Sequence, residues 1–123
     1  MDILNSIKEK FGKRIKNVLE HSPKRAYIDI DKKDVVDFCS FAFKDLEMRF
    51  VTASGVDTPE GFEILYHFSQ DKAPLIVSFR VAIPDKKYPE IDSLANIFRG
   101  AEWIEREMWE LLGNKGFASL ARF

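Results

Sequence analysis

One segment of the 123-residue chain gathers acidic, basic and aromatic side chains at spacings that could carry chemistry. Between Gly100 and Gly113 lie four glutamates, one arginine and two tryptophans. Two glutamates could act as a general acid and a general base. However, Glu105 and Glu107 point about 200° apart around a helix, which is poor geometry for a pair acting on one bond.

Two other interpretations of this segment stay open. A tryptophan beside acidic residues on an exposed helix face can anchor a protein interface. Alternatively, charged residues four positions apart simply stabilise a solvated helix by a few tenths of a kcal/mol. The residues that would carry an interface are Trp103, Glu105, Arg106, Glu107 and Glu110.

The remaining reactive side chains form no pattern typical of a catalytic or metal site. His21 lies before a turn and His67 lies on a predicted strand, with no other metal-ligand type at suitable spacing near either. Cys39 is the single cysteine, so no internal disulfide can form, and on a helix stripe it is expected to be a small buried residue. The six glycines form neither a phosphate loop nor a nucleophile elbow.

Local patterns predict the elements that must position these residues. A first helix carries apolar side chains with helical spacing and ends at Gly12. Two short strands follow over 15–19 and 26–30, separated by a turn at 22–24. Asp31 is predicted to cap a second helix, with Asp34 at its third position.

Three further strands are predicted over 48–53, 62–68 and 74–83, with a loop of turn-forming residues at 54–61. The last two alternate apolar and polar side chains, as expected of strands buried on one face. Helices are predicted over 93–100 and 101–112, with Gly113 at the C-cap. We therefore expect a single α+β domain over residues 1–123, of order α-β-β-α-β-β-β-α-α, with a mainly antiparallel sheet and helices on one face.

Composition excludes several classes of function. Nineteen basic and twenty acidic side chains leave a net charge of −1, which argues against a general nucleic-acid binder. No apolar run approaches the ~20 residues of a membrane-spanning helix, and no signal-peptide core is evident, so we expect an intracellular chain. Charge is nevertheless uneven, because residues 1–33 carry nine Lys and Arg against five Asp and Glu.

The segment from Ser93 to Gly113 resembles the signature of one subunit family. It reads Ser93-Leu94, Ile97-Phe98, Gly100-Ala101-Glu102-Trp103, Glu105-Arg106-Glu107 and Glu110-Leu111-Leu112-Gly113. This is similar to the thirty-kilodalton subunit of respiratory complex I and its counterpart in membrane-bound, energy-converting nickel-iron hydrogenases. The strand 62–68 and the turn 55–57 also fit, so the resemblance covers roughly residues 26–113.

The resemblance implies a structural role without chemistry of its own. Members of this family bind no cofactor and pack against a hydrogenase-type large subunit, beside an iron–sulfur small subunit. Nickel-iron and iron–sulfur centres are then expected in those partners. The chain would lie peripherally on the cytoplasmic side of the cell membrane, with only indirect membrane contact. Arg106 is expected to bridge to acidic groups in this chain or on the large subunit, because a buried arginine needs pairing.

One departure from the family pattern favours the hydrogenase version. Complex I members usually continue past the final glycine with Gly-His-Pro and Leu-Arg, whereas this chain has a tail over 114–123 whose three apolar residues have helical spacing. Three alternatives stay open. They are a place in complex I proper, a small stand-alone enzyme using Glu105, Glu107 or Glu110, and a free adaptor domain.

Overall fold

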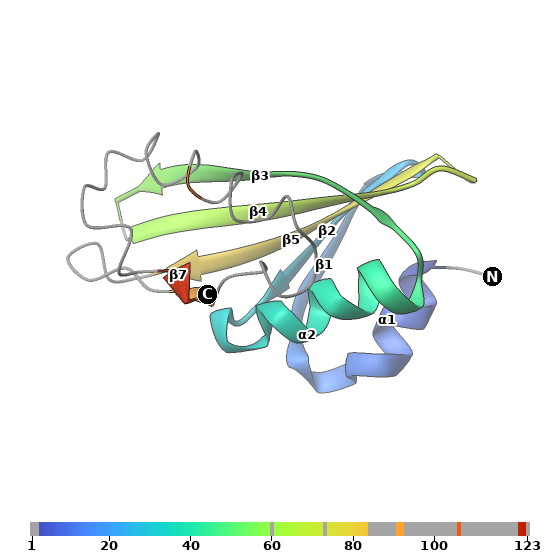
Figure 1. Cartoon of the computed structure of the whole chain (residues 1–123), viewed down its shortest axis with the longest axis horizontal. Helices are drawn as coiled ribbons and strands as arrows, with labels where there is room; N and C mark the ends of the chain where they lie inside the picture. Colours follow the sequence, from blue (N-terminus) through green and yellow to red (C-terminus); the bar gives the residue numbers. More distant parts are fainter. Residues whose placement is uncertain are drawn as a thin grey trace.

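The core of the fold is a five-stranded mixed sheet with helices on one of its faces (Figure 1). The computed structural model describes residues 3–59, 61–72, 74–83, 91–92, 106 and 121–122. In chain order the elements of the main domain are α1 (Ile3–Phe11), β1 (Ile15–Ser22), β2 (Arg25–Ile30), α2 (Val35–Ser40), β3 (Arg49–Thr58), β4 (Gly61–Gln70) and β5 (Leu75–Ile83). This confirms the α+β prediction and the order of the first seven elements.

The strands lie in the order β1-β2-β5-β4-β3. Three of the four neighbouring pairs are antiparallel, as predicted, and β2 with β5 is the parallel pair. In that pair Ala26 lies opposite Val77 and Ile28 opposite Phe79, so the apolar residues of both strands share one face. A hairpin of two strands therefore joins a meander of three along a single parallel pairing.

The first helix ends at Phe11, directly before a glycine with a left-handed backbone conformation. Gly12 has φ +52°, a left-handed conformation that costs an L-residue about 1–2 kcal/mol. The following 3-10 turn, η1 (Gly12–Arg14), leads directly into β1. The predicted stop at Gly12 is thus confirmed, and it has a backbone reason.

The prediction that Asp31 caps the second helix is wrong. Its side chain makes no capping hydrogen bond, because its carboxylate binds Lys16 Nζ at 2.6 Å. The 3-10 turn η2 (Lys32–Asp34) comes first, and α2 begins only at Val35. The helix then widens into the π-helical segment η3 (Phe41–Asp45), in which Leu46 N–H donates to the Phe41 carbonyl at 3.0 Å.

The predicted loop over 54–61 is also wrong, since β3 runs on to Thr58. Every position from Ser54 to Thr58 has a partner on β4, ending with Thr58 opposite Gly61. The Thr58 hydroxyl closes this end of the hairpin by donating to the Gly61 carbonyl at 2.8 Å. Pairing with a long neighbouring strand has overridden the turn preference of these residues.

The core lies between the sheet and the helices. Phe38 of α2 stacks on Phe11 of α1 with ring centroids 3.8 Å apart, and its edge meets Phe79 of β5 at 5.6 Å. Cys39 is fully buried beside them, as predicted. Alternate residues of β4, from Phe62 to Phe68, complete this layer with less than a tenth of each side chain exposed.

Several predictions fall on residues outside the described ranges. These are the end of the fifth strand at Pro84, the helices over 93–100 and most of 101–112, the cap at Gly113 and the tail up to residue 120. Arg106 is described and is helical, in agreement with the predicted helix. The apolar residues of the tail have helical spacing, but residues 121–122 form a strand. This strand, β7 (Ala121–Arg122), pairs in parallel with β6 (Ile91–Asp92).

Candidate partner interface

The predicted interface motif is represented among the described residues by Arg106. This residue is helical and exposed, so the expectation of a buried arginine is wrong for this chain. Trp103, Glu105, Glu107 and Glu110 lie outside the described residues. Their grouping, and the bridge from Arg106 to acidic groups, therefore stay predictions.

The sheet face away from the helices carries a polar network. Opposite the helix-covered face, Arg80 of β5 grips Asp29 of β2 with two hydrogen bonds, from Nε at 2.6 Å and from an Nη at 2.9 Å. The hydrogen bond to Asp29 raises the pKa of Arg80, so the pair stays charged. A two-pronged contact of this kind fixes both side chains across the parallel pair of strands.

His67 lies on the same face between two serines. Its Nδ1 is 2.7 Å from the Ser78 hydroxyl and its Nε2 is 3.2 Å from the Ser54 hydroxyl. Partial burial, helped by the positive charge of Arg25, lowers the pKa of His67. The imidazole is therefore neutral at pH 7.

The Ser78 hydroxyl cannot act as a catalytic nucleophile. Ser78 is the serine closest to the imidazole, but only 1% of its surface is exposed, so a substrate cannot reach its hydroxyl. The charge that acts on His67 is the cation of Arg25, which disfavours the imidazolium that a general base must form. His67 and Ser78 alternate in sequence with the buried apolar residues of β4 and β5, but their contact depends on the register of these two strands.

A second charged group ties η1 to η2 and the second helix. Arg14 binds Asp34 at 2.7 Å and Asp37 at 2.6 Å, while its guanidinium lies 5.2 Å from the Phe11 ring centre. The hydrogen bonds to Asp37 and Asp34 raise the pKa of Arg14. Beside it, Lys16 binds Asp31, and this contact lowers the pKa of that carboxyl.

The remaining candidate residues are not brought together. His21 lies exposed near the end of β1, with its ring edge-on to Tyr27 at 6.4 Å. Within the described ranges no three potential metal ligands lie close enough to hold an ion. Nor does any helix in those ranges have the length and hydrophobicity to cross a membrane.

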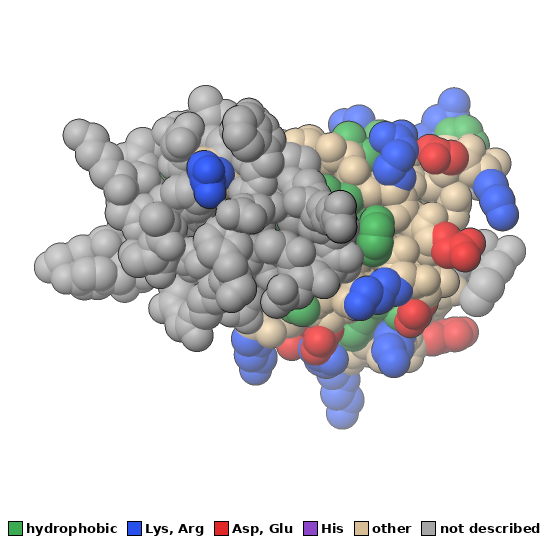
Figure 2. Space-filling model, in the orientation of Figure 1, with side chains coloured by type: hydrophobic (Ala, Val, Ile, Leu, Met, Phe, Trp, Pro, Cys, Tyr) green, Lys and Arg blue, Asp and Glu red, His purple; other side chains and the backbone are tan. Residues whose placement is uncertain are grey.

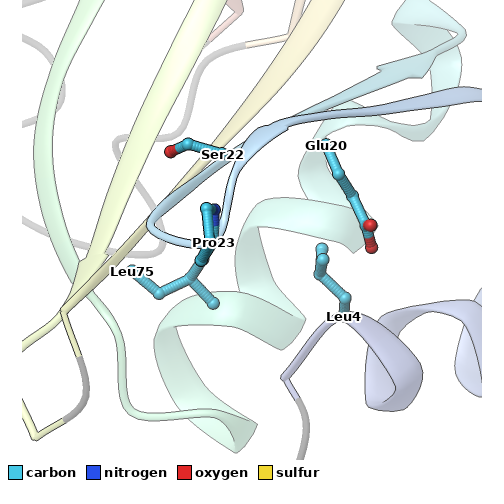
Figure 3. Close-up of a pocket in the computed structure, with 5 residues that line it drawn as sticks. All are labelled: Leu4, Glu20, Ser22, Pro23 and Leu75. Atoms are coloured by element: carbon cyan, nitrogen blue, oxygen red, sulfur yellow. The ribbon is translucent and has the colours of Figure 1, made fainter.

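A hollow of about 410 Å³ lies where the β1–β2 turn meets α1 and β5 (Figure 3). Figure 3 shows Leu4 from α1, Leu75 from β5 and Pro23 from the turn around it, with the carboxylate of Glu20 above Leu4. Ser22 completes the lining, and its hydroxyl already accepts the backbone N–H of Lys24 at 3.2 Å. A single carboxylate and a serine occupied in its own turn offer no set of reactive groups.

Comparison with known proteins identifies the family. Residues 28–115 match the family model described as respiratory-chain NADH dehydrogenase, 30 Kd subunit. Over 114 residues the chain is 30% identical to a subunit of the F(420)H(2) dehydrogenase of Methanosarcina mazei, covering 90% of this chain and 72% of that one. It is also 30% identical to a subunit of the NADH-quinone oxidoreductase of Chelativorans sp., covering 91% of this chain but only 58% of the relative.

Solved structures agree at the level of the fold. A chain of the membrane-bound sulfane sulfur reductase, an archaeal respiratory membrane complex, superposes with a TM-score of 0.74 at 22% identity, over 85% of this chain and 62% of that one. A trypsin-resistant fragment of Nqo5 gives 0.70 at 16% identity, over 92% of this chain and 93% of the fragment. The resemblance drawn from residues 26–113 is thereby confirmed, and the chain belongs to the family of the 30-kilodalton subunit of respiratory-chain NADH dehydrogenase.

Proposed function

We propose that this chain is a non-catalytic subunit of a membrane-associated electron-transfer complex, where it packs against the large subunit. The observation that carries the proposal is the match to the 30-kilodalton subunit family over residues 28–115. The relatives from Methanosarcina mazei and Chelativorans sp. are both named as subunits of oxidoreductase complexes. The chemistry of the described residues supports a structural role, because the His67–Ser78 contact is closed to substrate.

Within that class we propose an energy-converting nickel-iron hydrogenase. Asn114-Lys115-Gly116 stands where complex I members carry Gly-His-Pro, and this difference supports the hydrogenase version. The nickel-iron and iron–sulfur centres would then lie in a hydrogenase-type large subunit and an iron–sulfur small subunit. The chain itself would supply no ligand and would sit peripherally on the cytoplasmic side of the membrane.

A dehydrogenase of the complex I type is the second candidate. It is favoured by the names of the relatives, which are subunits of an F(420)H(2) dehydrogenase and of an NADH-quinone oxidoreductase. Both candidates give this chain the same structural task. They differ in the metal content and the electron donor of the partners.

The contact with the large subunit is proposed to involve Trp103, Glu105, Arg106, Glu107 and Glu110. The exposure of Arg106 supports this, since its guanidinium can meet a carboxylate of a partner. A bidentate pair of this type fixes orientation as well as adding affinity. The motif would therefore set how the two subunits are placed against each other.

Purification from native membranes with an affinity tag on this chain tests the proposal. We expect a large metalloprotein and an iron–sulfur subunit to copurify after mild detergent extraction. Nickel in the purified complex, with hydrogen-dependent reduction of a viologen dye, would support the hydrogenase. Oxidation of a reduced nicotinamide or deazaflavin without nickel would support the dehydrogenase. A chain that elutes alone as an active monomer, or alone without activity, would overturn the subunit assignment in favour of an enzyme or an adaptor.

The motif is tested in the same preparation. Glu107→Gln should leave the circular dichroism of the chain unchanged but reduce recovery of the large subunit. Glu20→Gln is a matched control, because Glu20 is an exposed glutamate on β1, away from the motif in sequence. Equal recovery and equal electron transfer with both variants would show that Glu107 has no part in the contact.

A further inference from the structure

Four lysines gather at one end of the β1–β2 hairpin, opposite its turn. They are Lys13 in η1, Lys16 in β1, and Lys32 and Lys33 in η2, and all four are exposed. The pairing of Ile15 with Ile30 brings the segments before β1 and after β2 together. We call this group the basic corner.

Two ion pairs hold the basic corner in place. Lys16 binds Asp31 at 2.6 Å, which joins β1 to the entry of η2. Arg14 binds Asp34 at 2.7 Å, which joins η1 to the end of η2. Because both pairs span the same two segments, the lysines next to them are presented from fixed backbone rather than from loose loops.

Among the described side chains, the corner carries more positive charge than its carboxylates neutralise. A hollow of about 410 Å³ is lined there by Lys16, Asp31, Lys32, Lys33 and Ala82. Asp31 is the one acidic group among these described residues, and it is already bound to Lys16. Lys32, Lys33 and Lys13 make no ion pair with the side chains that the structure describes, and the backbone of β6 (Ile91–Asp92) lies next to η2.

The corner lies in a segment that is basic overall. Between residues 3 and 33 all nine Lys and Arg side chains are exposed, against four carboxylates, of which Asp29 and Asp31 are each held by a cation. In Figure 2 Lys and Arg side chains project from the lower edge of the described region, where Asp and Glu side chains lie among them. An excess of one sign on one side attracts an oppositely charged partner and orients it.

We propose that the basic corner docks an acidic segment of a neighbouring subunit, with a carboxylate of that segment seated in the hollow against Lys32 and Lys33. The inference rests on the proposed function, since it needs a neighbouring subunit. It adds a second contact, made by residues outside the motif around Arg106.

The shape of the corner favours a polypeptide over a membrane surface. Lipid-binding surfaces combine basic residues with large apolar side chains that enter the bilayer. Among the described residues that line the hollow, Ala82 is the apolar one, and the exposed large hydrophobic residues of the described ranges lie elsewhere. Leu19 is further along β1, and Val51 and Val56 are on β3 at the opposite edge of the sheet.

Charge reversal in the full chain, purified as the native complex, tests the proposal. We expect Lys32→Glu/Lys33→Glu to lower recovery of the partner subunits about tenfold at low salt, as expected for two exposed charge contacts turned repulsive. The matched control is Lys24→Glu/Lys44→Glu, which makes the same charge change at exposed sites in the hairpin turn and in η3. This control should recover partners as the wild type does.

Crosslinking gives a readout that does not depend on the variant. A carbodiimide joins a lysine amine to a carboxylate in contact, so wild-type complex should yield a peptide linking Lys32 or Lys33 to an Asp or Glu of another subunit. If circular dichroism shows that the charge-reversed chain does not fold, the neutral variant Lys32→Gln/Lys33→Gln and the crosslink test the docking instead. Added salt should weaken both recovery and crosslinking.

The outcomes separate the two proposals. If wild-type chain recovers no other subunit, the proposed function fails and this inference fails with it. If wild type recovers its partners and the charge-reversed or neutralised chain recovers them equally, with no crosslink, only the docking of the basic corner is refuted. Flotation of the wild-type chain with phosphatidylglycerol vesicles, lost in the Lys32/Lys33 variant, would assign the corner to lipid and overturn the acidic-segment proposal.

Discussion

Substituting Gly12 by alanine tests whether backbone conformation alone ends α1. A Cβ built at this position meets nothing within 4 Å, so the substitution adds no steric clash with a neighbour. What remains is φ +52°, which costs an L-residue about 1–2 kcal/mol. Alanine also restricts the unfolded chain, which returns about 0.4–1 kcal/mol. The net expected loss in the free energy of unfolding is therefore about 1 kcal/mol.

Urea unfolding of the purified chain, followed by far-ultraviolet circular dichroism, measures this loss. With a slope of about 2 kcal/mol per molar urea, the midpoint should fall by roughly 0.5 M while the slope is unchanged. Gly12→Asn is the matched control, because asparagine tolerates the left-handed region and should lose less. A Gly12→Ala chain as stable as wild type would refute the reasoning, since it would mean that the helix can end another way at no cost.

Three other predictions follow from the same structure. Glu47 also has a left-handed backbone, with φ 53° just after η3. Glu47→Gly should therefore raise the free energy of unfolding by about 0.5–1 kcal/mol, and a lower urea midpoint would contradict this. A double-mutant cycle of Asp29→Ala and Arg80→Ala should give a coupling free energy of about 1 kcal/mol, because the pair is bidentate but partly exposed. Additive effects on the free energy of unfolding would show that the two hydrogen bonds contribute nothing. Since the pKa of His67 is lowered in the folded state, the unfolded state binds its proton first, and stability should fall as the pH drops from 7 through 6.5 towards that lower pKa. His67→Gln should remove that part of the pH dependence, whereas an unchanged pH profile would show that the imidazole is not its source.

The sequence predicts strands best where one face of the sheet is buried. β4 and β5 alternate apolar and polar residues, and the structure buries the predicted face from Phe62 to Ile83. Burial on one side imposes a period of two directly on the sequence, so no knowledge of the neighbours is needed. The same logic located α1, whose stripe of Leu4, Ile7 and Phe11 lies in the hydrophobic core.

Predictions failed where a partner distant in sequence decides the conformation. Ser54 to Thr58 have turn-forming side chains, yet β4 holds them extended. Asp31 has the right type and position for a cap, but Lys16 takes its carboxylate. Neither contact is local, so no window of sequence reveals it.

The candidate site shows the same limit. The motif around Arg106 was recognised from residue types and spacing, without knowledge of what it touches. The Asp29–Arg80 pair and the His67–Ser78 contact depend on strand register, which the sequence does not reveal. Lys32 and Lys33 belong to the basic segment 1–33 that composition reveals, but their approach to Lys16 depends on the pairing of β1 with β2.

The single parallel pairing of β2 with β5 divides the assembly of the sheet into two stages. Each side of that junction closes through short connections, while the junction itself joins residues such as Asp29 and Arg80, which are 51 positions apart. Contacts between residues so far apart in sequence have a high loop-closure entropy cost and form late in folding. The β1–β2 hairpin and the β3–β5 meander should therefore each form before β2 pairs with β5. During partial unfolding, β2 and β5 would therefore separate first. Each would then expose an unpaired strand edge that can pair with another chain.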